Sequence, residues 1–308
     1  MKFHYRCSQC GAEYDITPDR MVCPACAEAQ KPDEPLRGVL ETVFEGTPGK
    51  DLLFDILPVE KEYFPPIPVG GTPLWQPARI RRSEGFPELY IKDDTANPTG
   101  SFKDRASYLV AAFARKHEIR DIIVASTGNA ASSMAGVGAA AHLNVKIFIP
   151  KTAPRAKMVQ ALQYGAEVNL VDGTYDVAFD KSLEYSRASG GLSRNTAYNP
   201  LTIEGKKTAA IEIVLQLGSA PDAVFVPVGD GVILAGIYKG FRDLRRLGII
   251  DKLPTVYAVQ AEGSSAIARA FDKGDFGAPV PSSTMADSIS VDVPRNGYYA
   301  LRELKENG

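Results

Sequence analysis

Lys103 is the residue whose type and position most directly indicate chemistry. It lies in the segment NPTGSFKDRA (97–106), in which a turn leads to Ser101, a good N-cap, and Asp104 three residues later approximates a capping box. Helical apolar spacing follows, so Lys103 is predicted in the first helical turn, where the macrodipole disfavours a cation by roughly 0.3–1 kcal/mol. A solvated surface lysine would tolerate this cost. A nucleophilic or Schiff-base lysine would use it, because a helix N-terminus and burial both lower the pKa of the amine.

Four cysteines form a second group with chemical potential. They are all the cysteines of the chain and lie in two C-x-x-C pairs separated by twelve residues: Cys7, Cys10, Cys23 and Cys26. Each pair fits a tight turn, and two such turns predict one tetrahedral zinc ion. Four thiolates leave no open coordination position, so the metal would be structural. Two disulfides or a redox C-x-x-C are the alternatives.

Two glycine-containing turns follow predicted strands. In VASTGNAASS, Ser126, Thr127 and Gly128 precede a helix and could offer N–H and O–H donors to a carboxylate or phosphate. In VPVGDGVILAG, two glycines flank Asp230 and allow close approach to an anion. Leu234 breaks the dinucleotide pattern G-x-G-x-x-G, and no Gly-Lys-Ser/Thr completes a P-loop, so a cup for a single phosphate fits better. Ordinary helix capping and a tight turn are the alternatives.

Alternating strands and helices must position these groups. Beyond residue 88 we expect βαβ units and parallel sheets, which defines an α/β fold whose ligands bind at the carboxyl ends of the strands. The expected strands cover 88–94, 121–126, 145–150, 167–172, 223–229 and 255–263, and the expected helices 102–118, 129–143, 153–165, 175–189, 203–218 and 233–248. The proline-rich residues 27–70 are predicted as a connector with one helix near 52–57.

Composition narrows the class of protein. The chain has 308 residues, 44% of them hydrophobic, and a net charge of −2, which gives no general attraction to nucleic acid or to an anionic membrane. No apolar run has the length of a membrane span, and the N-terminus does not have the features of a signal peptide. We therefore expect a cytoplasmic protein without nucleic-acid or membrane partners.

A neutral lysine, an oxyanion turn and a phosphate cup together indicate a pyridoxal phosphate enzyme. The chain resembles the fold type II enzymes that use this cofactor, with a tryptophan synthase β-like two-lobed fold, and most closely the threonine synthase family. The resemblance rests on segments in family order: GGTPLW (70–75), NPTGSFKDRA (97–106), ASTGNAASS (125–133), NP..IEGKKTAAIEI (199–213), FVPVGDG (225–231) and AVQAEG (258–263). An N-terminal zinc ribbon also occurs in members of this family.

The resemblance implies a role for each matching residue. Lys103 would be the Schiff-base lysine and proton shuttle, Phe102 would pack beside the cofactor, and Asn129 would hydrogen-bond its 3′-oxygen. Backbone amides of the turn would bind the cofactor phosphate, and the first glycine turn would bind the substrate carboxylate. The cofactor-binding set is then Lys103, Phe102, Asn129, Gly229, Asp230, Gly231, Val232 and Ile233, and the substrate-binding set is Ser126, Thr127, Gly128 and Thr202.

Three departures from the family pattern bear on the substrate. Thr202 stands where an arginine is expected to hold the substrate phosphate, and Asp230 brings a carboxylate to an anion site. We find no Ser or Thr equivalent to the one that the family places against the pyridine nitrogen, so we expect that the chain is part of a longer protein. The leading hypothesis is a lyase that converts O-phosphohomoserine and water to threonine and phosphate.

Alternatives remain open at this point. They are another fold type II enzyme that performs β-elimination or β-replacement (a dehydratase, an ammonia-lyase or an O-phosphoserine-using synthase), a cofactor-binding regulator without catalysis, and a zinc-anchored binding module. The predicted organisation is a zinc ribbon at 1–30, a large cofactor-binding domain from 31–105 and 200–308, and a small mobile domain at 106–199. The family resemblance implies a homodimer.

Overall fold

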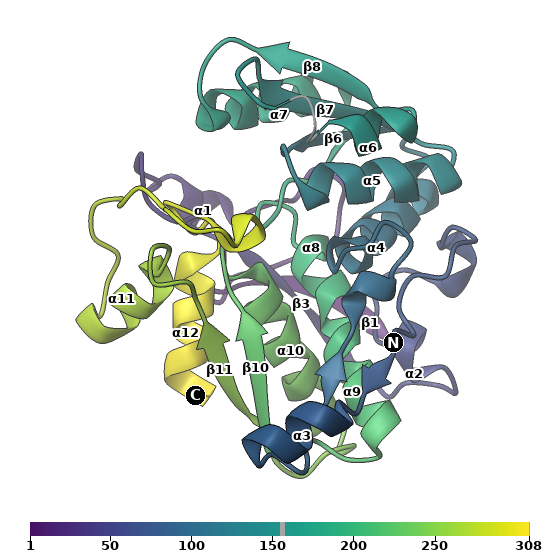
Figure 1. Cartoon of the computed structure of the whole chain (residues 1–308). Coiled ribbons are helices and arrows are strands. Elements are labelled where there is room, and N and C mark those ends of the chain that lie inside the picture. Colours follow the sequence, from purple (N-terminus) through teal and green to yellow (C-terminus); the bar gives the residue numbers. More distant parts are fainter. Residues whose placement is uncertain (155–157, 308) are drawn as a thin grey trace.

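The computed structural model describes residues 1–154 and 158–307, and it has an α/β architecture with parallel sheets, as predicted. A four-stranded parallel sheet has the order β8-β7-β6-β9, and Figure 1 shows it with its helices as the upper part of the molecule. Its strands are β6 (Asp121–Ala125), β7 (Asn144–Pro150), β8 (Glu167–Val171) and β9 (Leu192–Ser193). All three strand pairs are parallel, as βαβ units require.

Helices cover both faces of this sheet. The surrounding helices are α4 (Lys103–Lys116), α5 (Asn129–Ala140), α6 (Val159–Gln163) and α7 (Tyr175–Ser189). Ile122 and Val124 of β6 belong to the core that includes α5, whereas Ile123 packs with Phe179 of α7. The alternation explains the continuous apolar run of β6, since both of its faces are buried. The helix predicted over 153–165 is shorter at α6, and residues 155–157 lie outside the described residues.

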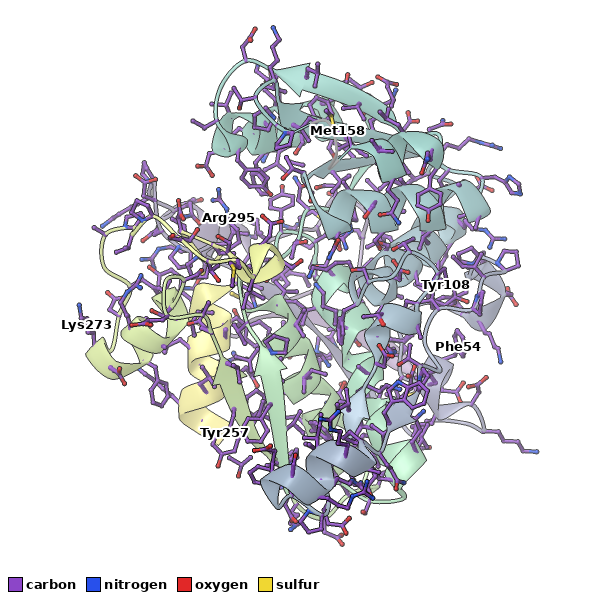
Figure 2. The ribbon with its side chains drawn as sticks, viewed as in Figure 1. Phe54, Tyr108, Met158, Tyr257, Lys273 and Arg295 are labelled. Atoms are coloured by element: carbon purple, nitrogen blue, oxygen red, sulfur yellow. The ribbon has the colours of Figure 1, made fainter. Side chains whose placement is uncertain are left out.

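A second parallel pair lies in the lower part of Figure 1. It consists of β10 (Ala223–Pro227) and β11 (Thr255–Val259), and the surrounding elements are α8 (Leu201–Glu204), η4 (Gly205–Lys207), α9 (Thr208–Leu217), α10 (Val232–Arg246), α11 (Ala266–Lys273) and α12 (Gly297–Asn307). A separate core joins α9, α10 and this pair. On the other face of the pair, Phe225 and Tyr257 stack and are exposed, and Figure 2 labels Tyr257 there.

The N-terminal region is more ordered than the sequence predicted. The strands β1 (Lys2–Cys7), β2 (Glu13–Tyr14) and β3 (Leu40–Glu45) form an antiparallel sheet, and α1 (Pro24–Ala27) carries the second cysteine pair. The prediction that 27–70 is mainly a connector was wrong for β3, which pairs with β1 over six residues and has five buried residues. The predicted helix near 52–57 is α2 (Leu52–Asp55). The remaining short elements are η1 (Lys61–Tyr63), β4 (Leu74–Trp75), α3 (Ala78–Glu84), β5 (Ile91–Lys92), η2 (Asp94–Ala96) and η5 (Asp287–Ile289).

Glu41 of β3 fastens the N-terminal sheet to the body. Its buried carboxylate accepts hydrogen bonds from Arg6 of β1 (2.8 Å), Arg242 of α10 (2.9 Å) and the Tyr299 hydroxyl of α12 (2.8 Å). Burial alone would raise the pKa of Glu41, and Arg242 and the other nearby cations hold it well below its usual range. The N-terminal sheet is therefore linked by charge to the long helix α10.

The division into lobes at residues 106 and 199 stays a prediction. Among the described residues, every helix is too short or too polar to cross a membrane.

Candidate active site

The turn before α4 places Lys103 at a helix N-terminus, as predicted. Gly100 has a φ of +74°, and this left-handed residue brings Thr99 over the end of the helix. The Ser101 hydroxyl accepts the Lys103 amide N–H at 3.1 Å, whereas the Asp104 carboxylate accepts the Thr99 amide N–H at 2.8 Å. The predicted capping box was therefore wrong in its second half, because Asp104 holds the preceding turn and does not reach the Ser101 amide.

Lys103 lines a small pocket together with the glycine turn that precedes α10. Burial lowers the pKa of the Lys103 amine, which Asp230 opposes and Arg194 reinforces. The pocket is lined by Lys103, Val228, Gly229, Asp230, Gly231, Ile233, Ser288, Ile289 and Val291. Phe102 lies beside it, half-buried, with the Arg105 guanidinium 5.7 Å from its ring centroid. The structure thus brings Lys103 together with the glycine turn that precedes α10, 126 residues later.

The glycine turn ends at the first residue of α10. Gly231 has a φ of +87°, and the Asp230 carboxylate accepts the Val232 amide N–H at 3.0 Å. Asp230 therefore caps the helix while it also faces the pocket. A Cβ on Gly229 would lie 3.0 Å from the Ile289 backbone, so glycine is needed for residues 288–291 to close over the turn. The Val232 side chain is fully buried in a neighbouring core and does not line the pocket.

The other predicted turn lies outside the lining of the pocket. The Ser126 hydroxyl accepts the Gly128 amide N–H at 3.1 Å, and the exposed Asn129 donates its side-chain N–H to Ser288 at 3.3 Å. Thr127 is half-buried. The Asn129–Ser288 bond links the region of the four-stranded sheet to the segment that lines the pocket.

A second contact bridges the same two regions. Arg295, which Figure 2 labels between the upper and lower parts of the molecule, forms an ion pair with Asp176 of α7. Together with the Asn129–Ser288 bond, this ion pair links the region of the four-stranded sheet to residues 288–295.

Thr202 lies away from the pocket lining. Its hydroxyl donates to the Asn199 carbonyl at 2.8 Å and accepts the Ala197 amide N–H at 3.2 Å, and its side chain is fully buried. The hydroxyl is thus engaged by the local turn.

Sequence reasoning missed two buried cations near the pocket. Arg194 follows β9 and donates to neutral hydroxyls, those of Ser107 (3.2 Å) and Thr196 (2.8 Å). Burial lowers its pKa to about 10, so the guanidinium stays protonated at neutral pH. Lys206 in η4 is fully buried, and its amine has no hydrogen-bond partner in residues 1–154 and 158–307. Two adjacent lysines in a helical segment were the only sequence signal for the second cation.

The four cysteines converge although no disulfide joins them. Their sulfur atoms all lie within 4.8 Å of one another, and the Cys7–Cys26 and Cys10–Cys23 pairs are each 3.7 Å apart. Four thiolates about 2.3 Å from a tetrahedral zinc ion lie about 3.8 Å from each other. The sulfur positions therefore match the geometry of a Cys₄ metal site.

The sequence is similar to a known protein family and to individual known proteins. The profile of the family "Pyridoxal-phosphate dependent enzyme" matches residues 67–308. The chain is 33% identical to the threonine synthase of Methanosarcina acetivorans, with 99% of this chain and 77% of the relative aligned. It is 32% identical to the threonine synthase of Methanocaldococcus jannaschii, over 98% of this chain and 77% of the relative.

Solved structures with the same fold include a threonine deaminase from Solanum lycopersicum and a serine racemase from maize. The deaminase has a TM-score of 0.67 and 26% identity, over 85% of this chain and 75% of that one. The racemase has the same TM-score at 20% identity, over 77% and 69% of the two chains, and shows likeness of fold alone.

Proposed function

The chain belongs to the family of pyridoxal-phosphate dependent enzymes, and on this premise we propose that it catalyses the threonine synthase reaction, in which O-phosphohomoserine and water give threonine and phosphate. It is similar to threonine synthases along nearly its whole length, with 33% identity over 99% of the chain. The observation that carries the proposal is the position of Lys103: a buried amine with a lowered pKa beside a helix N-terminus that is built for an anion.

The residues of the pocket fit the cofactor. Beyond Val232, whose amide N–H the Asp230 carboxylate accepts, the first-turn amides of α10 lack intrahelical partners and lie at the pocket end of the helix, which suits a phosphate group. Lys103 supplies the amine that holds the aldehyde, with Phe102 packed at its side. When bound, the cofactor supplies an electron sink for negative charge that develops at Cα or Cβ of an amino acid.

Lys103 is the proposed base and acid of the reaction. Its amine would take a proton from Cα, return protons along the substrate and assist addition of water at Cβ. Desolvation serves this work, because it favours the neutral amine that accepts a proton near neutral pH. Ser126, Thr127 and Gly128 would hold the substrate carboxylate at the N-terminus of α5, and Asn129 would orient the cofactor.

Closure of the upper part over the pocket would exclude water from these steps. The Asn129–Ser288 and Asp176–Arg295 contacts are the groups that would make and break as the opening changes. We propose the region 106–199 as the moving part.

The four cysteines would hold a structural zinc ion. The 3.7 Å sulfur separations support this assignment, and the closed set of four sulfurs gives the ion no catalytic role. Metal analysis of protein purified under reducing conditions is expected to give about one zinc per chain. A folded, metal-free protein would contradict the proposal. The homodimer expected from the sequence also stays a prediction, and light scattering would measure it.

One experiment tests the reaction. O-phosphohomoserine is added to the holoenzyme while the visible cofactor band, phosphate release and threonine formation are followed together. A shifted band with phosphate and threonine in equal amounts supports threonine synthase. A band that ignores this substrate and responds to serine, threonine or O-phosphoserine would replace it with β-elimination or β-replacement. This comparison of substrates is necessary because position 202, where an arginine is expected to hold the substrate phosphate, is a threonine. The Thr202 hydroxyl is already hydrogen-bonded to local backbone.

A further inference from the structure

Lys206 lies between the two helices that form the pocket. A Cβ on Gly205 would lie only 2.3 Å from the Arg105 carbonyl, so η4 packs directly against the first turns of α4, which begins at Lys103. A Cβ on Gly236 would lie 2.7 Å from the Lys206 Cβ, so the base of the Lys206 side chain packs against α10. The backbone of Lys206 is therefore held between the helix that carries the reactive lysine and the helix that carries the glycine turn.

The buried side chain of Lys206 lies near the charged groups at the N-terminal end of α10, and it is not among the residues that line the pocket. The charged groups that act on its amine are Asp230, Lys103 and Arg194, and Asp230 is the first among them. All three lie at the pocket end, whereas Lys239 and Asp243 lie further along α10 in the other direction. Gly236 follows Gly231 by five residues, which is about 7.5 Å along the helix, and an extended lysine side chain covers most of this distance.

The charge around Lys206 is not balanced. Lys103, Arg194 and Lys206 are three basic groups in the interior. Asp230 acts on all three, and Asp104 acts on Arg194 as a second acid. Burial of an amine without a hydrogen-bond partner costs stability, and burial lowers the pKa of Lys206 accordingly. An anion at the N-terminus of α10 would supply the missing partner, and the protonated Lys206 would offset the repulsion between this anion and Asp230.

We propose that Lys206 binds a phosphate group at the N-terminus of α10 and compensates there for the carboxylate of Asp230. The phosphate belongs either to the cofactor or to the substrate. Both sources follow from the proposed function, on which this proposal therefore rests. In either case Lys206 provides the side-chain cation that the threonine side chain at position 202 does not provide.

The variant Lys206→Met removes the amine and keeps the length of the side chain. We expect its apoprotein to resist urea at least as well as the wild type, because an unpaired buried amine is lost. We expect phosphate-bearing ligands to bind about 10- to 100-fold more weakly, as for the loss of a charge-assisted hydrogen bond. Lys252→Met is the matched control, since Lys252 is exposed and pairs with Asp222 on the surface.

Three ligands separate the two sources. The apoprotein is titrated with pyridoxal phosphate and with pyridoxal, and the holoenzyme is titrated with inorganic phosphate by calorimetry. A lower ratio of pyridoxal phosphate to pyridoxal affinity in Lys206→Met supports the proposal with the cofactor phosphate as the ligand. An unchanged ratio with weaker binding of inorganic phosphate to the holoenzyme supports it with the substrate phosphate as the ligand.

Unchanged affinities for all three ligands would overturn the proposal, as would a Lys206→Met protein that is less stable and otherwise normal. The second variant, Lys206→Met combined with Asp230→Asn, keeps the test decisive. Because the amide still accepts the Val232 N–H and carries no charge, we expect it to restore much of the lost affinity; no recovery would contradict the compensation of Asp230. These readouts do not need turnover, so a holoenzyme that ignores O-phosphohomoserine would refute the reaction and leave the Lys206 result standing.

Discussion

Lys206 and Lys207 are neighbours in sequence and equally buried, and the structure treats them in opposite ways. The Lys207 amine donates to Asp243 at 2.8 Å and to the Ile56 carbonyl at 2.7 Å, and it forms an ion pair with Glu204. The Lys206 amine has no such partner among the described residues. One lysine completes the interior, and the other is left available to a ligand.

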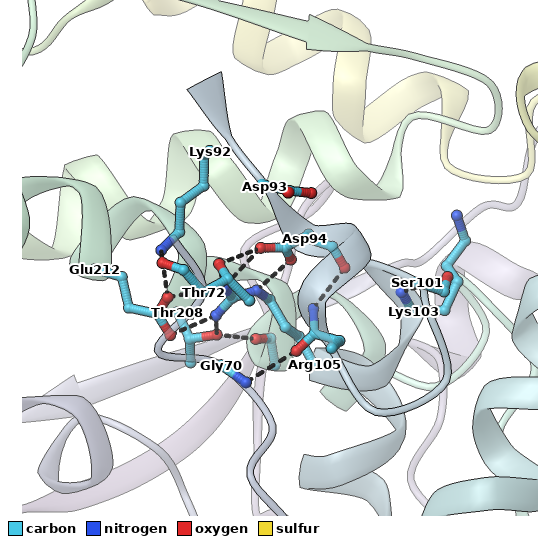
Figure 3. A network of polar contacts seen from close by, with 12 residues as sticks. Gly70, Thr72, Lys92, Asp93, Asp94, Ser101, Lys103, Arg105, Thr208 and Glu212 are labelled. Carbon is cyan, nitrogen blue, oxygen red and sulfur yellow. Dashed lines mark hydrogen bonds and ion pairs between the residues drawn. The ribbon is translucent and has the colours of Figure 1, made fainter. Parts of the chain in front are cut away.

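The same contrast occurs within the first turn of α4. Arg105 donates to Asp94 (2.6 Å), Glu212 (2.7 Å), Thr208 (3.0 Å) and Thr72 (3.1 Å), and Figure 3 shows these bonds converging on its guanidinium. Lys103 lies apart from that network in Figure 3 and forms no ion pair with any described residue. Buried charges with complete partners maintain the fold, and buried charges without them mark the site of chemistry.

The largest effect is expected at Lys103. Lys103→Ala removes the proposed base and the attachment point of the cofactor, so turnover falls by at least about 10³-fold and the visible cofactor band is lost. The free energy of unfolding of the apoprotein changes little, since no ion pair is broken. A retained cofactor band, or a large loss of stability, would contradict the contrast drawn between Lys103 and the fully paired Arg105.

The paired lysine should give the largest effect on stability. Lys207→Met leaves Asp243 and Glu204 short of a partner and is expected to cost about 3–5 kcal/mol in urea unfolding, whereas Lys206→Met costs nothing. Lys206→Met is thus its matched control. Equal losses in the two variants would show that the difference in pairing has no energetic meaning.

The Arg105 network predicts a pH dependence. Burial raises the pKa of Glu212 and hydrogen bonds from Arg105 outweigh it, so its pKa falls from 4.5 to about 2. The folded protein then holds fewer protons than the unfolded chain, and stability is present above pH 4.5 and lost as the pH falls toward 2. The contribution is about 3 kcal/mol. In Glu212→Gln, urea unfolding at stepped pH should show a loss of stability in acid that is smaller by this amount. A pH profile identical to that of the wild type would exclude Glu212 as the group responsible.

The smallest effect is expected at Thr202. Thr202→Val removes two local hydrogen bonds and should cost about 1–2 kcal/mol in stability. The KM for O-phosphohomoserine should stay within about twofold, because the hydroxyl bonds to backbone. A tenfold higher KM at unchanged kcat would indicate that Thr202, and not Lys206, binds the substrate phosphate.

The sequence allowed prediction of those features that depend on neighbouring residues. The position of Lys103 at a helix N-terminus follows from the turn before it, and α7 follows from its apolar spacing and coincides with the predicted residues 175–189. The closeness of Lys103 and the glycine turn was predicted from the rule that the carboxyl ends of parallel strands share one edge. The rule does not explain it, because β5, the strand before Lys103, pairs antiparallel with β4 in a separate sheet.

The features that escaped prediction depend on distant residues. Lys207 finds two of its partners 151 and 36 residues away, at Ile56 and Asp243, and only Glu204 lies nearby in sequence. The local sequence therefore does not show which of the two lysines is paired. The strand β3 escaped because more than thirty residues, which contain the short elements β2 and α1, separate it from its partner β1. Its buried run LETVF also lacks a polar alternation. Asp104 resembled a capping residue because the left-handed turn at Gly100 was not foreseen.

Glu41 has a consequence for how the protein opens. Because its carboxylate joins Arg6, Arg242 and Tyr299, the N-terminal sheet cannot separate without leaving the buried Glu41 short of its partly exposed arginine partners. Residues 2–7 and 232–246 therefore form one cooperative unit, and their amide protons should exchange with solvent at a common opening free energy. Exposure of the cysteine cluster should therefore require the same opening that releases α10, the helix that follows the glycine turn.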